Sequence, residues 1–388
     1  MREQVYNEQA YQRSVECAES VRGRTSPNPA VGAVVVRDGT VIGWGATQPP
    51  GGPHAERQAL LHAGPAARGA DLYVTLEPCT FHGRTPPCTD AISAAGIARV
   101  FFVMRDPDPR MGGGAEDALR ASGIACRQIS PADERVRLQL APFFLRIQQH
   151  RPLVTWKYAM SLDGKIATHT GMSQWISTRD SRSVVHAIRN TVDAVMTGSG
   201  TVLADDPLLT VRIADHVTLR QPLRVVIDSR GQCPPSAKVF CQQHAATLVF
   251  CTNDAPAIWQ QALTRHGVQV ICQPMSGRVD LRAATAQLSD MGINHVLLEA
   301  GAGLAGACAD AQLIDEIHCF IAPGVIGNQH APSPLAGHGI EQLHEWRAFR
   351  FVEQFVHGGD MHIHAVHHRI DALFQHNQQG VSTCLPAS

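Results

Sequence analysis

The chain has 388 residues, of which 44% are hydrophobic and 17% charged, a balance typical of globular proteins with two or three domains. Its formal net charge is -1, from 33 basic and 34 acidic residues, so no basic excess favours a nucleic-acid partner. A small phosphorylated ligand is compatible with this charge, because one or two local arginines can hold a phosphate group.

The polar residues 1–10 lack the apolar segment of a signal peptide, and no run of 18 apolar residues predicts a membrane span. The 11 cysteines are scattered and odd in number, which favours a reducing compartment over a disulfide framework. We therefore expect a cytoplasmic protein that does not contact a membrane.

The first 149 residues predict alternating helices and strands. Apolar spacing and Pro or Gly punctuation predict the helices, and clusters of β-branched residues predict the strands. The expected helices lie at 8–22, 53–62, 88–96, 115–121 and 132–150, and the expected strands at 31–36, 40–44, 72–76 and 100–104.

The pattern restarts after Arg151-Pro152. Strands are expected at 154–160, 194–197, 224–227, 247–251, 268–272, 295–298, 316–321, 349–355 and 361–365, with helices at 181–190, 256–266, 281–291 and 304–311. We therefore place one α/β domain at 1–149 and a second at 150–368, followed by a polar tail at 369–388 that we expect to be flexible.

His54, Cys79 and Cys88 predict a metal site. One histidine and two cysteines supply the ligands of a catalytic zinc site, which keeps its fourth position for water. Glu56 lies two residues after His54, where it can take a proton from an activated water and pass it to a ring nitrogen and leaving ammonia. A closed structural site would need a fourth protein ligand, for which only His82 is near. The H-x-E … P-C … C arrangement therefore favours a zinc deaminase, although its cysteines are farther apart than in the C-x-x-C form.

Longer motifs carry a family resemblance. Residues 27–32 (PNPAVG), 53–56 (PHAE), 76–79 (LEPC) and 82–88 (HGRTPPC) resemble the deaminase half of the RibD family of bacterial riboflavin-biosynthesis proteins. Residues 157–164 (KYAMSLDG), 173–176 (SQWI), 200–212, 227–229 and 299–301 resemble its reductase half. The resemblance covers residues 5–367 and keeps the order of the motifs.

This resemblance implies a bifunctional enzyme. A diaminopyrimidinone ribosylamino phosphate would first lose an amino group to give the aminouracil, and NADPH would then reduce the ribosyl group to a ribityl chain. The implied fold is a cytidine-deaminase-like N-terminal domain followed by a dihydrofolate-reductase-like C-terminal domain. The implied cofactors are Zn²⁺ and NADPH, and two active sites on one chain would suit a homo-oligomer.

The resemblance also implies which residues form the sites. Asn28 would hold the substrate ring in the deaminase, through an amide that donates and accepts hydrogen bonds. In the reductase, the substrate would contact Ser173, Arg189, Leu209, Arg212 and Glu299. The NADPH site would be lined by Ala159, Trp175, Thr201, Asp205, Ser229, Gly301, Ala302 and Gly303. Asp205 is the candidate for orienting or protonating the substrate, although 205–207 (DDP) is also typical of an ordinary turn.

By itself, the second half gives weaker signals. It has no G-x-G-x-x-G after a strand, and the glycines at 198–200 and 301–303 fit either a pyrophosphate contact or tight packing. Residues 299–302 (EAGA) depart from the common Glu-Gly-Gly-Pro, and residues 106–109 (DPDP) from Asp-Pro-Asn-Pro. We expect the extra methyl groups to weaken NADPH binding slightly.

Two alternatives stay open from the residues. The altered segment 299–302 would also suit a non-catalytic nucleotide-binding or oligomerisation module attached to an active deaminase. An RNA or free-nucleoside deaminase is disfavoured by the neutral charge and by the second-half motifs. Arg84 is a candidate either for a phosphate contact or for a structural hydrogen bond.

Overall fold

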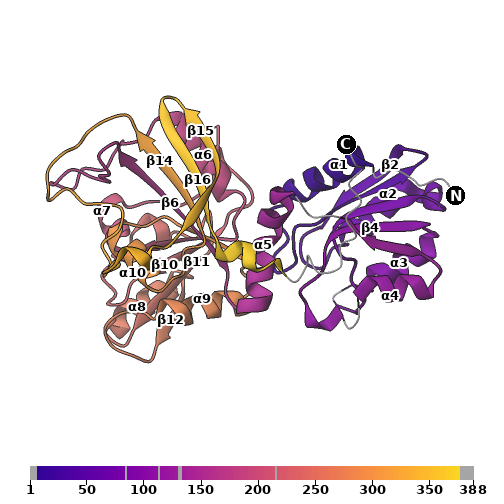
Figure 1. Ribbon diagram of the computed structural model, residues 1–388. Helices are drawn as coiled ribbons and strands as arrows, with labels where there is room; N and C mark the ends of the chain where they lie inside the picture. The colour runs from indigo at the N-terminus through magenta and orange to yellow at the C-terminus, as the bar shows by residue number, and fades with distance from the viewer. Residues whose placement is uncertain (1–6, 84, 112–113, 130–132, 215, 376–388) are drawn as a thin grey trace. The chain divides into compact units, whose positions relative to one another are not determined.

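The computed structural model describes residues 7–83, 85–111, 114–129, 133–214 and 216–375 (Figure 1). The chain divides into two compact units. The first contains the residues up to Gln149 and those from Asp371 onward, and the second contains His150–Ile370. Both are α/β, as the sequence predicts. Within the described residues, no helix is long and apolar enough to cross a bilayer.

The first unit is built on a five-stranded sheet with the order β2-β1-β3-β4-β5. Its β1 pairs antiparallel with β2 and β3, and β3, β4 and β5 are parallel. The strands are β1 (Gly32–Arg37), β2 (Thr40–Ala46), β3 (Asp71–Leu76), β4 (Arg99–Met104) and β5 (Ala125–Gln128), and the helices are α1 (Glu8–Glu19), α2 (Ala55–Ala63), α3 (Cys88–Ala95), α4 (Gly114–Ala121) and α5 (Glu134–Gln149).

Glycines allow the helices of this unit to lie directly on the sheet. A Cβ on Gly32 would meet the Ser14 carbonyl of α1 at 1.9 Å, and a Cβ on Gly43 would meet the Ala59 carbonyl of α2 at 2.4 Å. Side chains at these positions would push the helices away, so the absence of a Cβ sets the close approach. Helix α2, whose N-cap is the predicted zinc histidine, is held against β2 in this way, and a Cβ on Gly45 would meet the Ala55 carbonyl at its start at 2.9 Å.

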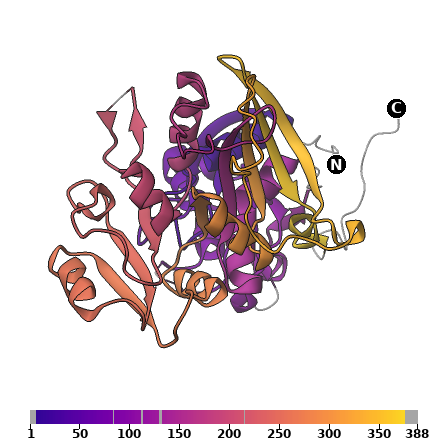
Figure 2. The same cartoon turned by 90° about the vertical axis from the view of Figure 1, so that its left-hand side faces the viewer.

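The second unit contains a nine-stranded sheet with the order β12-β11-β10-β7-β13-β6-β14-β16-β15. Neighbours from β12 to β14 are parallel, whereas β16 pairs antiparallel with β14 and β15 (Figure 2). The strands are β6 (Leu153–Ser161), β7 (Ala194–Gly198), β10 (Leu223–Ile227), β11 (Thr247–Thr252), β12 (Gln269–Gln273), β13 (His295–Leu298), β14 (Glu316–Ala322), β15 (Phe349–His357) and β16 (Asp360–His367), beside a small ribbon of β8 (Arg212–Ile213) and β9 (His216–Val217).

Helices cover both faces of the parallel region, whose strands are therefore nearly continuous apolar runs. Val225 of β10 lies in a core with Ala284 and Ala305, and the next residue, Val226, lies in another core with Leu263. The helices are α6 (Arg179–Arg189), α7 (Ser199–Asp205), α8 (Ala257–Arg265), α9 (Leu281–Asp290), α10 (Ala302–Asp310) and α11 (Arg369–Ala372).

Several parts of the structure differ from the sequence expectation, among them the ribbon of β8 and β9, which was not predicted. The short strand β5 and the glycine-containing helix α7 were not predicted. The expectation of a flexible tail is wrong for residues 369–374, because α11 forms there and Phe374 is buried with its ring centroid 4.7 Å from that of Phe144. Residues 376–388 of the expected tail lie outside the described residues.

Candidate active sites

Three predicted ligands meet in the first unit. His54 is the N-cap of α2, Cys79 follows β3, and Cys88 is the first residue of α3. The Nδ1 atom of His54 lies 3.6 Å from Sγ of Cys79 and 3.4 Å from Sγ of Cys88. Tetrahedral zinc with ordinary bond lengths separates a nitrogen and a sulfur ligand by about 3.6 Å. The three donors therefore fit a zinc ion.

The surroundings of Cys79 favour its thiolate form, whereas a hydrogen bond to Cys79 and burial raise the pKa of the Cys88 thiol. The Cys79 sulfur accepts a hydrogen bond from the backbone N–H of Cys88 at 3.3 Å. Hydrogen bonds from Cys88 and His54 lower the pKa of the Cys79 thiol, which favours the thiolate that binds zinc.

Glu56 is the second residue of α2, two residues after His54, and is buried. Burial raises the pKa of its carboxyl group, so the group accepts a proton more readily than an exposed glutamate. His54, Glu56, Cys79 and Asn28 all line one cavity of about 300 Å³. Two of the three predicted ligands, the predicted proton carrier and the predicted ring contact thus line one pocket, and Cys88 is buried behind it.

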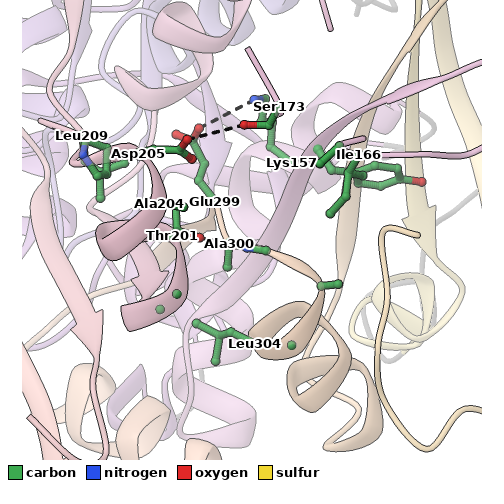
Figure 3. A pocket seen from close by; sticks show the side chains of 18 of the residues that line it. Lys157, Ile166, Ser173, Thr201, Ala204, Asp205, Leu209, Glu299, Ala300 and Leu304 are labelled. Atoms are coloured by element: carbon green, nitrogen blue, oxygen red, sulfur yellow. Dashed lines mark hydrogen bonds and ion pairs between the residues drawn. The ribbon is translucent and has the colours of Figure 1, made fainter. Parts of the chain in front are cut away.

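A larger cavity of about 840 Å³ lies in the second unit, at the carboxyl ends of β7, β10 and β13 (Figure 3). Ligands commonly bind at such ends of parallel strands. All thirteen residues that the resemblance implies for the reductase line this one cavity: Ala159, Ser173, Trp175, Arg189, Thr201, Asp205, Leu209, Arg212, Ser229, Glu299, Gly301, Ala302 and Gly303.

A buried charge network forms one wall of this cavity. Glu299 receives two hydrogen bonds from the Arg189 guanidinium, one of them from the terminal nitrogen at 3.0 Å, and Lys157 Nζ lies 3.8 Å from its carboxylate. Burial alone would raise the pKa of Glu299, but the charges of Arg189 and Lys157 outweigh it and lower the pKa to about 2. Arg189 also donates to the Thr210 carbonyl at 3.0 Å. A phosphate would therefore have to share or displace these partners of Arg189.

Arg212 approaches the cavity from β8 beside His186 of α6. Its backbone N–H donates to Nδ1 of His186 at 3.1 Å, and its terminal nitrogen lies 3.4 Å from Nε2 of the same ring. Burial and the charges of Arg189 and Arg212 lower the pKa of His186 to about 4. The ring is neutral near pH 7 and can accept the backbone hydrogen bond.

The starts of two helices, α7 and α10, also line this cavity. The backbone N–H of Gly301, the N-cap of α10, donates to Oγ1 of Thr201 in α7 at 3.0 Å. A Cβ on Gly200 or Gly303 would meet nothing within 4 Å, so these glycines leave open space where a bulky anion could approach the backbone. The residues therefore fit the pyrophosphate of a nucleotide.

Asp205 is the last residue of α7 and is exposed towards the cavity. Its Oδ1 accepts hydrogen bonds from Ser173 Oγ and from the Gln174 side-chain amide, both at 3.4 Å (Figure 3). Asp205, the candidate for protonating the substrate, thus lies at the end of a helix rather than in an isolated turn.

Sequence reasoning missed several lining residues. Lys157 is a charged residue within an apolar strand, a signal that could have marked it as functional. In the deaminase pocket, burial raises the pKa of Asp106 to about 7, and Arg146 lies on the same wall. Arg84 lies outside the described residues, so its two proposed roles stay undecided.

Comparisons with known protein families match both halves. Residues 5–104 match the cytidine and deoxycytidylate deaminase zinc-binding region, and residues 152–363 match the RibD C-terminal domain. The chain is 40% identical over 329 residues to the riboflavin biosynthesis protein RibD of Aquifex aeolicus, covering 85% of this chain and 90% of that protein. It is 38% identical over 364 residues to RibD of Escherichia coli, covering 91% and 97%.

Solved structures agree with the sequence matches. Acinetobacter baumannii RibD superposes with a TM-score of 0.83 at 33% identity, covering 93% of this chain and 98% of that one. A Thermotoga maritima structure, described as a diaminohydroxyphosphoribosylaminopyrimidine deaminase and 5-amino-6-(5-phosphoribosylamino)uracil reductase, superposes with a TM-score of 0.81 at 33% identity, with the same coverage. The predicted cytidine-deaminase-like and reductase domains are confirmed. The chain belongs to the RibD family of bifunctional riboflavin-biosynthesis enzymes, with a zinc-binding deaminase domain and a nucleotide-dependent reductase domain.

Proposed function

We propose that His54, Cys79 and Cys88 hold Zn²⁺ and that Glu56 moves the protons of a hydrolytic deamination. The observation that carries this proposal is that Nδ1 of His54 lies 3.4–3.6 Å from both cysteine sulfurs, next to the buried carboxylate of Glu56. Zinc bound there would make the attacking water more acidic. Glu56 would take the proton from this water and deliver it first to the ring nitrogen and then to the departing amine.

The proposed substrate is the diaminopyrimidinone ribosylamino phosphate, as the description of the Thermotoga maritima structure suggests. Asn28 lines the same cavity as Glu56, where its amide could accept from one ring group and donate to another. The cavity of about 300 Å³ suits a single pyrimidine ring held near the triad.

For the second site, we propose NADPH as hydride donor and the deaminated aminouracil as substrate. The cofactor would lie along Ala159, Trp175, Thr201, Ser229 and residues 301–303, all of which line the larger cavity. Its nicotinamide would supply the hydride to the ring-opened imine carbon of the ribosylamine.

Five residues are proposed to contact the sugar-phosphate chain: Ser173, Arg189, Leu209, Arg212 and Glu299. Since Arg189 is bound to Glu299 and Thr210, we assign the main phosphate contact to Arg212 and a positioning role to Arg189. Asp205 would orient or protonate the reacting nitrogen. Asp205→Asn should then slow reduction and leave deamination unchanged, whereas unchanged reductase kinetics would remove this role.

The test is a coupled assay with zinc-loaded protein, the diaminopyrimidinone substrate and NADPH, in which ammonia and NADPH are followed separately. Ammonia release followed by NADPH oxidation supports both proposed reactions and their order. The reductase proposal would be contradicted if ammonia is released without NADPH oxidation and if NADPH is also not oxidised when the deaminated substrate is supplied directly. Neither signal from zinc-loaded protein would contradict the proposed substrate. Repeating the reduction with NADH would test the preference for NADPH.

We also propose that the enzyme is a cytoplasmic homo-oligomer. All ten cysteines in the described part of the chain are unpaired, as in a reducing compartment. The edge strand β15 exposes Phe351, Phe355 and Val356, which a second copy of the chain could cover. Light scattering of the purified chain should give at least twice the mass of one chain, and Phe351→Lys should lower it.

A further inference from the structure

A second group of side chains that could bind a metal lies in the reductase unit, outside the set of residues that lines its cavity. Glu316 and His318 are on β14, and His364 is on the adjacent strand β16 (Figure 1). Among the described residues, this group and the deaminase triad are the two sets whose donor atoms come close enough to hold a metal ion. None of the three residues lines the 840 Å³ cavity.

The sheet register brings these side chains together. His318 and His364 are directly paired across the antiparallel strands, and Glu316 is two residues before His318. Because side chains alternate between the two faces of a strand, all three project from the same face. The two imidazole rings lie parallel, with centroids 4.4 Å apart and an interplanar angle of 15°.

The donor atoms already converge. Nε2 of His364 lies 2.6 Å from Oε1 of Glu316, and one donor atom of each residue lies within 4.8 Å of the other two. Tetrahedral zinc requires nitrogen and oxygen ligands about 3.3 Å apart. A metal ion can therefore be accommodated if the donor separations change by no more than about 1.5 Å, which rotations of these side chains can supply.

A second layer of contacts orients two of the proposed ligands, Glu316 and His318. The Thr155 hydroxyl donates to Oε2 of Glu316. Nδ1 of His318 is hydrogen-bonded to Nε2 of His362 at 2.9 Å, and Nδ1 of His362 lies 3.3 Å from Nε2 of His357. Such partners on the outer nitrogen fix the orientation of metal-binding histidines.

We propose that Glu316, His318 and His364 form a second metal site, which takes a divalent transition cation of the Zn²⁺ type and joins β14 to β16. The ligands are Oε1 of Glu316 and Nε2 of each histidine, with water completing the coordination. Two imidazoles and a carboxylate suit zinc, and they differ from the deaminase triad in having no sulfur. The site is structural, since it is built into the sheet rather than into the substrate cavity.

The test uses the full chain with its deaminase zinc site removed by Cys79→Ser and Cys88→Ser. The purified chain is depleted of metal, loaded with Zn²⁺, dialysed and measured by elemental analysis. We expect two zinc ions in the parent chain and one in the serine variant. Adding His318→Gln and His364→Gln to the serine variant should weaken the remaining site by about 100-fold or more and leave no retained zinc.

A matched control replaces His330 and His338, two exposed histidines of the same unit, by glutamine in the serine variant. This control should keep its zinc ion. The proposal is overturned if the serine variant retains no zinc, or if its zinc is equally retained after the substitutions at His318 and His364.

A second measurement does not depend on variants of the proposed ligands. Zinc X-ray absorption of the serine variant should show nitrogen and oxygen neighbours with two imidazoles and no sulfur. A spectrum with fewer than two imidazoles would contradict the proposal. Zinc should also raise the melting temperature of the reductase unit in this variant, because an ion that binds only the folded state stabilises it.

Discussion

The two pockets hold their functional groups in different ways. In the deaminase, three metal donors and one carboxylate come from only 35 consecutive residues, 54–88. Two of the donors, His54 and Cys88, lie at the starts of α2 and α3, and α2 packs closely against β2. In the reductase, the lining residues extend from Lys157 to Ala336, and one carboxylate, Glu299, is paired with two cations. In the deaminase, replacing a single atom of one side chain should therefore abolish the chemistry. In the reductase, a substitution in the charge network should reduce both stability and activity.

Glu56→Gln should give the largest effect. The amide keeps the size of the side chain but cannot carry the proton, so we expect deaminase kcat to fall by about 10³-fold. Zinc content and reductase kcat with deaminated substrate should stay unchanged, because no ligand and no residue of the other cavity is altered. Loss of zinc in this variant would show that Glu56 supports the metal site rather than the proton transfer.

Glu299→Gln should affect both stability and activity of the reductase. It leaves Arg189 and Lys157 buried beside a neutral amide, which we expect to cost about 3 kcal/mol of unfolding free energy and to reduce reductase kcat/KM by about 100-fold. Urea unfolding and NADPH oxidation would measure these losses. Deaminase kinetics should not change, and a parallel loss there would contradict the separation of the two sites.

The same carboxylate predicts a pH dependence. The pKa of Glu299 in the folded protein, about 2, is below the ordinary value of 4.5. Its contribution to the free energy of unfolding is therefore complete above pH 4.5 and is lost as the pH falls towards 2. The shift corresponds to about 3 kcal/mol. Unfolding free energy of the reductase unit should therefore fall across this window in the parent chain and fall less in Glu299→Gln. Equal slopes in both would show that Glu299 is not the group responsible.

The contrast between the sites also explains what sequence could predict. The zinc ligands and Glu56 are close in the chain, so their spacing indicates the chemistry directly. Lys157 and Glu299 are separated by most of the reductase domain, and their ion pair depends on the order of strands in the sheet. The resemblance implied the lining residues of the reductase cavity, but the restraint of Arg189 by Glu299 required the folded geometry.

Helix α7 and the end of the chain show the same limit. Gly200 and Asp206-Pro207 are typical of turns, yet residues 199–205 form a helix over the end of β7. Leu373 and Phe374 stand in a polar stretch, and the burial partner of Phe374, Phe144, is more than two hundred residues away in the sequence. Local propensity describes such segments poorly because distant packing decides their structure.

His186→Gln should have an intermediate effect. The neutral imidazole accepts from the Arg212 backbone and lies against its guanidinium, so its loss should disorder Arg212. We expect KM for the phosphorylated substrate to rise about 10-fold, the equivalent of about 1.4 kcal/mol, with kcat changed little. Steady-state kinetics with the deaminated substrate would measure this. A fall in kcat at unchanged KM would place His186 in the chemical step instead.

Ala300→Gly should give the smallest effect. Ala300 lines the reductase cavity and packs against the core. Removing its methyl group should lower KM for NADPH about two-fold by widening the cofactor path, and the lost packing and the freer unfolded chain should cost about 1 kcal/mol of stability.

Ala311→Gly provides the control for this smallest effect. Ala311 packs against the same core but does not line the cavity, so the control should lose comparable stability without changing KM for NADPH. If Ala300→Gly and the control behave alike, the methyl group does not restrict the cofactor. The reductase cavity would then tolerate the loss of a methyl group from its wall, whereas the zinc site depends on the 3.4–3.6 Å distances between His54 and its two cysteines.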